Sequence, residues 1–97
     1  MTGKVLTEVV ATVPTNRVPE VVPAFQALVA RPLPDGLIRT ELLEGSDGTW
    51  RIQTLWRDQG ALDAMRAGSE PPAAPALFRG LGAEPAVAIL RMQQAHP

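Results

Sequence analysis

The chain contains no cysteine and only one histidine, so the residue types that build most protein metal sites are scarce. Without cysteine there is no disulfide, no thiolate nucleophile and no cysteine-ligated metal. The one histidine, His96, is the next-to-last residue, which nearly excludes a metal site built on histidines. We therefore expect no metal and no cofactor.

The chain also lacks a basic excess and long apolar runs. Its formal net charge is −1, which provides no positive field to attract phosphates, so we expect no nucleic-acid partner. Its apolar stretches are far shorter than the ~20 residues that a transmembrane helix needs. The N-terminus does not combine a basic region with a long apolar run, as a signal peptide would. We therefore expect a cytoplasmic protein with no membrane partner.

The length of 97 residues fits one domain covering residues 1–97. A domain of this size buries only about 60–70% of the surface of its unfolded chain. It can fold alone, but a partner subunit would add to its stability.

Apolar periodicity and turn residues divide the chain into strands and helices. Strands are predicted at 4–13, 37–44 and 49–56, and helices at 58–67 and 73–81. A further helix follows an N-cap at Thr15-Asn16 and carries an apolar stripe from 18 to 29, where Pro23 either delays its start or kinks it. The last element, 86–93, has a period that suits a helix or a strand. Its short length and the preceding Pro85 favour a strand.

The resulting order, βαββαβ with the second helix in two pieces, is that of a ferredoxin-like α+β fold, with a four-stranded antiparallel sheet and helices on one face. The strand at 4–13 is apolar on both of its faces, so the face away from the helices needs a cover of its own. We expect that cover to be the sheet of a second copy, which gives a homodimer through the open sheet face.

Both tryptophans lie on one predicted strand, Trp50 near its start and Trp56 at its end. The turn that precedes this strand contains Asp47-Gly48, a strong hairpin signal. If a short loop joins the two strands, alternate residues of both lie on the same face of the sheet. That face is then predicted to carry Leu37, Arg39, Glu41 and Leu43 from the first strand, and Trp50, Ile52, Thr54 and Trp56 from the second. A slip of one residue would exchange the two faces of a strand.

These residues resemble the antibiotic biosynthesis monooxygenase-like family, part of the dimeric α/β-barrel group. The resemblance covers most of the chain, and its most specific part is the stretch from Ile52 to Leu62: a strand ending in Trp56, then acidic Asp58 and the pair Ala61-Leu62. The family implies a dimeric α/β barrel and a cofactor-independent monooxygenase acting on an aromatic polyketide or quinol. The asparagine, tryptophan and histidine of its haem-degrading members are missing at the matching places, near Val9 or Val10, near Met65 and near Pro75.

The resemblance also implies a site on the face that carries the tryptophans. A flat, electron-rich substrate must be held and its anion favoured while it passes an electron to dioxygen. Trp50 and Trp56 are expected to be its apolar walls. Arg39 is expected to stabilise the oxyanion, and Glu41 to accept the proton if burial raises its pKa. The remaining predicted substrate-binding residues are Phe25, Thr54 and Met65.

Each of these assignments competes with a structural alternative. Tryptophans at strand ends usually belong to the core, and Met65 suits a gap in the core equally well. Arg39 and Glu41 could form an exposed ion pair worth only ~0–1 kcal/mol. At the level of function, the alternatives are a non-catalytic dimeric small-molecule-binding or stress-related module and a ligand-sensing domain. The sensing domain is the weakest, because the chain has no helix-turn-helix segment.

Overall fold

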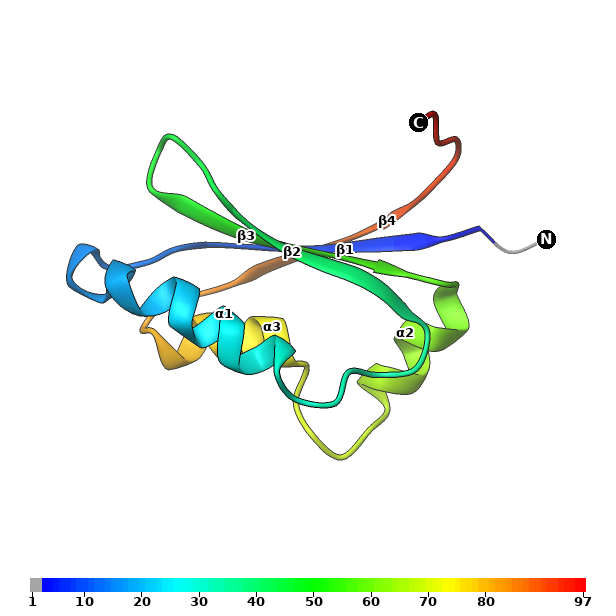
Figure 1. Cartoon of the computed structure of the whole chain (residues 1–97), viewed down its shortest axis with the longest axis horizontal. Coiled ribbons are helices and arrows are strands. Elements are labelled where there is room, and N and C mark those ends of the chain that lie inside the picture. Colours follow the sequence, from blue (N-terminus) through cyan, green and yellow to red (C-terminus); the bar gives the residue numbers. More distant parts are fainter. Residues whose placement is uncertain (1–2) are drawn as a thin grey trace.

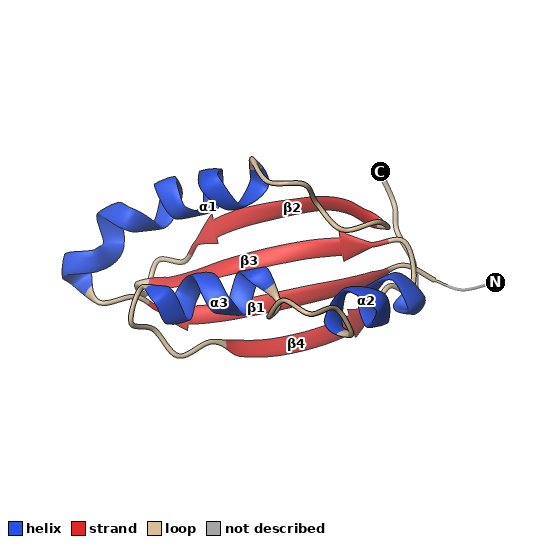
Figure 2. Ribbon diagram, turned by 90° about the horizontal axis from the view of Figure 1, so that it is seen from below, coloured by secondary structure: helices blue, strands red, loops and turns tan. Residues whose placement is uncertain are grey.

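The computed structural model describes residues 3–97, which form one antiparallel sheet with every helix on a single face (Figure 1). In chain order the elements are β1 (Val5–Thr12), the 3₁₀-helix η1 (Thr15–Glu20), α1 (Val21–Val29), β2 (Leu37–Glu44), β3 (Thr49–Trp56), α2 (Gln59–Arg66), α3 (Ala73–Gly80) and β4 (Ala86–Arg91). The strands lie in the order β2-β3-β1-β4, so β2 and β4 are the edges of an open sheet (Figure 2). The predicted ferredoxin-like α+β fold is confirmed.

The last element is a strand, as its length and the preceding proline indicated. β4 pairs with β1 in antiparallel register from Val10↔Ala86 to Val5↔Arg91. Among the described helices, none has the length and apolar character that crossing a bilayer requires.

The first helical segment differs from the prediction at its start. Thr15-Asn16 was expected to be an N-cap, but η1 begins at Thr15 directly after Pro14, and no side chain caps it. The first of the two outcomes predicted for Pro23, a helix that begins late, is confirmed, because α1 begins only at Val21. Pro23 is the third residue of α1, within the first turn, where a backbone N–H has no partner inside the helix and its absence costs little.

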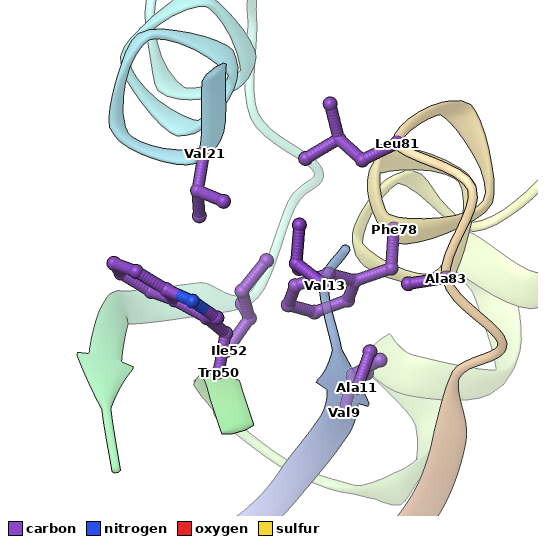
Figure 3. Packing of buried hydrophobic residues seen from close by; sticks show 9 residues of the cluster. All are labelled: Val9, Ala11, Val13, Val21, Trp50, Ile52, Phe78, Leu81 and Ala83. Atoms are coloured by element: carbon purple, nitrogen blue, oxygen red, sulfur yellow. The ribbon is translucent and has the colours of Figure 1, made fainter. Parts of the chain in front are cut away.

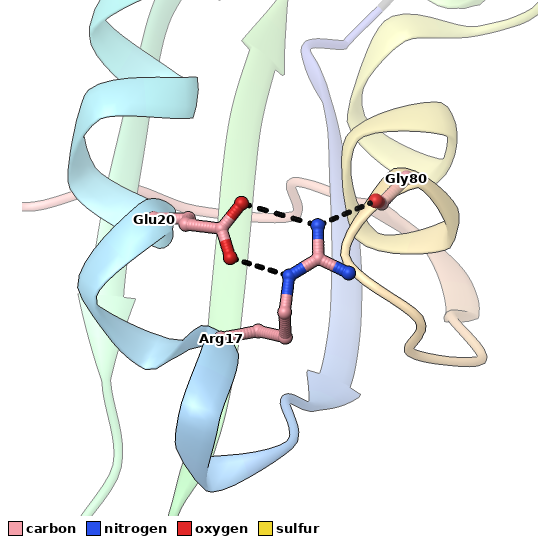
Figure 4. A network of polar contacts seen from close by, with 3 residues as sticks. All are labelled: Arg17, Glu20 and Gly80. Atoms are coloured by element: carbon pink, nitrogen blue, oxygen red, sulfur yellow. Dashed lines mark hydrogen bonds and ion pairs between the residues drawn. The ribbon is translucent and has the colours of Figure 1, made fainter.

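A polar contact joins this segment to α3. The guanidinium of Arg17 donates to the carboxylate of Glu20 and, from Nη2, to the backbone carbonyl of Gly80 at 3.2 Å (Figure 4). The bond from Arg17 lowers the pKa of Glu20 and in turn raises the pKa of Arg17. The contact therefore satisfies a carbonyl at the end of α3 and holds η1 against it.

The larger core cluster lies beneath one end of the sheet, between β1, β3, α1 and α3 (Figure 3). Its centre is Phe78 of α3, which is fully buried, and Trp50 of β3 lies on the α1 side. The other buried members are Val9, Ala11, Val13, Val21, Ile52, Leu81 and Ala83. This cluster fastens α1 and α3 to the sheet.

The predicted pairing of faces between β2 and β3 is wrong by one residue. The register pairs Thr40 with Thr54, Leu42 with Ile52 and Glu44 with Trp50, and it pairs Glu41 with Gln53. The pairing shifts at an irregularity between Leu37 and Arg39, so only Leu37, opposite Trp56, keeps its predicted face. Arg39, Glu41 and Leu43 therefore lie on the open face, away from the tryptophans.

Gly36 provides a test of how closely α2 approaches the start of β2. Its φ is 83°, and an added Cβ would lie 2.4 Å from the Cβ of Ala61. Gly48 has the same φ, but an added Cβ would meet nothing within 4 Å. We expect Gly48→Ala to lower the free energy of unfolding by about 1–2 kcal/mol, the cost of a left-handed residue. Gly36→Ala should cost roughly 1–3 kcal/mol more, because of the clash with Ala61.

Urea denaturation of the two variants measures the difference between their free energies of unfolding. Because Gly36 and Gly48 have the same φ, that difference reports the clash with Ala61. Equal losses in the free energy of unfolding would show that the approach of Ala61 to Gly36 is not tight.

Candidate functional site

Three threonines form a row across the helix-covered face of the sheet. Thr7 of β1 pairs with Thr54 of β3, and Thr54 pairs with Thr40 of β2. On one side of this row lies the larger core cluster. On the other lies a smaller cluster of Val5, Trp56, Ala61 and Leu62, with Leu37 and Met65 packed against it. The threonine row therefore divides the interior into two apolar halves.

Hydrogen bonds connect the threonines to each other and to Trp56. The indole Nε1 of Trp56, which is 3% exposed, donates to Thr7 Oγ1 at 3.1 Å. Thr7 Oγ1 lies 3.5 Å from the backbone carbonyl of Thr54, and the hydroxyls of Thr40 and Thr54 are 2.9 Å apart. Each hydroxyl has one proton. The Thr40–Thr54 contact uses one of their two protons, so the other remains free to donate to a ligand.

A cavity of about 610 Å³ lies over this row. Its floor consists of the three threonines with Val9, Ile52 and Trp56, and its walls include Leu28, Leu33, Leu37, Leu62, Met65, Val87 and Ile89. Apolar walls with a few convergent polar groups are typical of small-molecule sites of this size.

Two proline-rich connections contribute the remaining wall of the cavity. They contain Pro32 and Pro34 after α1, and Pro71 and Pro72 before α3. Proline fixes its own φ, which limits the conformations of these connections. An ion pair of 3.2 Å between Arg31 and Glu70 links the two connections, with both side chains largely exposed. The charged groups lining the cavity are thus Arg31, Arg66, Glu70 and Arg79.

The position of α2 is set by Asp58, as its acidic start predicted. Asp58 Oδ1 accepts a hydrogen bond from the backbone N–H of Ala61 at 2.8 Å. This bond is the main reason that the pKa of Asp58 is lowered. The capped helix presents Leu62 and Met65 to the cavity.

The predicted site residues fall into three groups. Thr54, Trp56 and Met65 line the cavity. Trp50 is buried in the larger core cluster with Phe25 packed against that cluster, and neither lines the cavity.

Arg39 and Glu41 lie on the opposite face of the sheet and form an ion pair with an N–O distance of 3.0 Å and side-chain exposures of 59% and 49%. The shared face that motivated their catalytic assignment does not exist. Their role in catalysis stays a prediction without that support.

Two polar cavity residues, Thr7 and Thr40, were not predicted. The signal for Thr7 was present, because it alternates with Val5 and Val9 on a strand whose other residues of that face are apolar. Thr40 could not be placed without the register of β2. Within residues 3–97, no three acidic or histidine side chains gather where they could hold a metal ion.

The fold matches solved structures over nearly the whole chain. SnoaB, a cofactor-independent oxygenase from Streptomyces nogalater, in a single-residue mutant form, is 25% identical, with 98% of each chain covered and a TM-score of 0.74. A candidate antibiotic biosynthesis monooxygenase from Deinococcus radiodurans is 14% identical, with 96% of each chain covered and a TM-score of 0.76. The structure of Rv0793 from Mycobacterium tuberculosis is 18% identical, covers 97% of this chain and 99% of that one, and has a TM-score of 0.72.

These similarities confirm the resemblance to the antibiotic biosynthesis monooxygenase-like proteins at the level of the fold. No protein-family model matches the sequence, and no curated protein matches it significantly.

The bond between Trp56 and Thr7 can be tested by a double-mutant cycle. Thr7→Val keeps the shape of the side chain but leaves the buried indole N–H without an acceptor. We expect it to lower the free energy of unfolding by about 1–3 kcal/mol. In a Trp56→Phe background, which has no N–H, the same substitution should cost much less. Urea denaturation of the four proteins measures the coupling, and equal costs in both backgrounds would contradict the bond.

Proposed function

We propose that the protein is a cytoplasmic, cofactor-independent monooxygenase that oxidises a flat quinol- or anthrone-type aromatic compound with dioxygen. The observation that carries this proposal is the cavity itself. It is large enough for a small fused-ring molecule, has apolar walls, and offers a free hydroxyl proton on its floor. The similarity in fold to SnoaB, a cofactor-independent oxygenase, supports the same reaction class.

The reaction needs no electrons from outside the substrate. An anthrone-type CH₂ loses a proton, and the resulting anion transfers one electron to dioxygen. The two radicals combine into a peroxide at that carbon, and loss of water leaves a ketone. Two hydrogens and one oxygen atom leave as water, and the other oxygen atom stays on the carbon. The protein's task is to hold the ring, favour the anion and keep bulk water away.

The cavity residues supply the first two of these functions. Trp56 and Ile52 provide apolar surface for a ring, and the Thr40–Thr54 pair can donate one hydrogen bond to a substrate oxygen. A bond from a fixed donor is stronger to an oxyanion than to a neutral carbonyl, so it favours the deprotonated state. Among the lining residues, the one carboxylate is Glu70, which is exposed and paired with Arg31. We propose that the proton leaves through water at the cavity mouth.

The position of Glu70 also favours a second candidate function. A cavity whose one carboxylate lies at its mouth, bound to an arginine, is equally suited to binding without catalysis. This second candidate is a non-catalytic small-molecule-binding or stress-related module.

Oxygen uptake with anthrone and a naphthoquinol, together with ligand binding by tryptophan fluorescence, separates the two candidates. For the monooxygenase, we expect the double variant Thr40→Val/Thr54→Val to lower kcat/KM by about tenfold or more, because it removes both hydroxyls that could donate a hydrogen bond worth about 1.5–3 kcal/mol to the developing charge. Trp50→Phe, in the core and away from the cavity, is the control for general effects on packing.

Binding without oxygen uptake would favour the second candidate, and neither binding nor uptake would reject both. An Arg39→Ala variant with unchanged uptake would remove Arg39 from the catalytic residues.

We also propose that the protein is a homodimer joined through the open face of the sheet. That face carries Leu6, Val10, Leu43, Leu55 and Leu90, and in one copy Leu43 and Leu90 are 39% and 48% exposed. Its polar groups already satisfy one another. Arg51 and Gln53 donate to the two carboxylate oxygens of Glu8 at 3.2 and 2.9 Å, so contact with a second sheet would leave few groups of this network unpaired.

The dimer can be tested by sedimentation as a function of concentration. We expect the wild-type protein to sediment as a dimer and Leu90→Arg to sediment as a monomer, because a buried unpaired charge would lie in the interface. Val22→Arg is the matched control, since Val22 is 46% exposed and lies on helix α1, on the other side of the sheet. A wild-type protein that stays monomeric at all concentrations would reject this assembly.

A further inference from the structure

We infer that the ligand of this cavity is an aromatic acid, whose negative charge complements the arginines that line the cavity. The inference rests on the proposed function, because it takes the same cavity as the ligand site. It adds the charge of the ligand, which the apolar walls alone do not define.

The charge of the cavity is opposite in sign to that of the protein. The chain as a whole carries a formal net charge of −1. The cavity is lined by Arg31, Arg66 and Arg79 and by a single acidic residue, Glu70, which leaves a formal charge of +2. A concave site with apolar walls concentrates the field of such charges and favours ligands of the opposite sign.

Two of the three arginines have no side-chain partner in the part of the chain that the structure describes. Most arginines of this chain are engaged, including Arg31 by Glu70. Within residues 3–97, Arg66 and Arg79 make no ion pair and no side-chain hydrogen bond. Their N–H groups are therefore free to bind a carboxylate, the acceptor that matches the fork of a guanidinium.

The arginines also have a structural role at helix ends, and that role does not use up their charge. Arg66 is the last residue of α2, and Arg79 lies in the last turn of α3. A helix C-terminus is equivalent to roughly half a negative charge, whereas each guanidinium carries a full positive charge. The lining of the cavity therefore remains positive after the helix dipoles are taken into account.

Glu70 acts as an internal competitor of the ligand. Its carboxylate holds Arg31 at 3.2 Å while both side chains stay in water, at exposures of 79% and 65%. An exposed pair of this kind is weak, so a ligand carboxylate can displace Glu70 from Arg31. Removing the charge of Glu70 should therefore strengthen binding of an acid, the opposite of the effect of removing an arginine.

Fluorescence titration with two matched probes tests the inference. The acidic probe is 9-anthracenecarboxylate, and the neutral probe of nearly the same shape is 9-anthracenecarboxamide. We expect the acid to bind about five- to tenfold more tightly at low salt, consistent with more than one exposed charge contact. The preference should shrink as salt approaches about 0.5 M, where the screening length is only a few ångströms.

Charge-removing variants identify the groups responsible. Arg66→Gln and Arg79→Gln should each weaken binding of the acid by about two- to fivefold and leave the carboxamide unchanged. Glu70→Gln should tighten binding of the acid by about twofold or more. Arg91→Gln, an exposed arginine that does not line the cavity, is the control and should change neither affinity. All four side chains are exposed, so the variants should fold, and circular dichroism checks this.

Equal affinities for the acid and the carboxamide would overturn the inference while the aromatic cavity of the proposed function stands. Failure of both probes to bind would overturn the proposed function and the inference with it.

Discussion

The site depends on one row of hydroxyl groups in the middle of an otherwise apolar sheet face. Thr7, Thr54 and Thr40 occupy the central positions of three neighbouring strands, where larger apolar residues would join the two core clusters into one. Small polar side chains do not fill the space beneath the helices, and they hold one another by hydrogen bonds. The row leaves room over the middle of the sheet, and the helices and their connections enclose that room as the cavity.

The rest of the molecule keeps that cavity from collapsing. Phe78 and its neighbours fasten α1 and α3 at one end of the sheet, and Trp56 with Leu62 fastens α2 at the other. Arg17 fixes the end of α3 against η1, and prolines restrict the connections that lie over the space between. Because the two core clusters hold the helices at both ends of the sheet, the cavity between them can remain open without loss of the fold.

Much of the architecture could be predicted from the sequence, because its signals are local. The turn at Asp47-Gly48, the cap at Asp58 and the proline before β4 each define an element from a few neighbouring residues. The faces of β2 could not be predicted, because they depend on how two strands pair across an irregularity between Leu37 and Arg39. Because the predicted pairing differed from the observed one by one residue, Arg39 and Glu41 were assigned to the wrong face and Thr40 was not recognised as a cavity residue.

The exposure of β4 affects the tendency of this protein to aggregate in solution. β4 is an edge strand, its six residues are all exposed in a single copy, and the run from Ala86 to Leu90 contains no charge. Free N–H and C=O groups along such an apolar edge can recruit strands from other chains into growing aggregates. Natural edges are commonly guarded by lysine, proline or a bulge, and here the first charged residue is Arg91 at the very end. Partial unfolding, which frees further strand edges beside β4, is therefore the condition under which this chain is most exposed to aggregation.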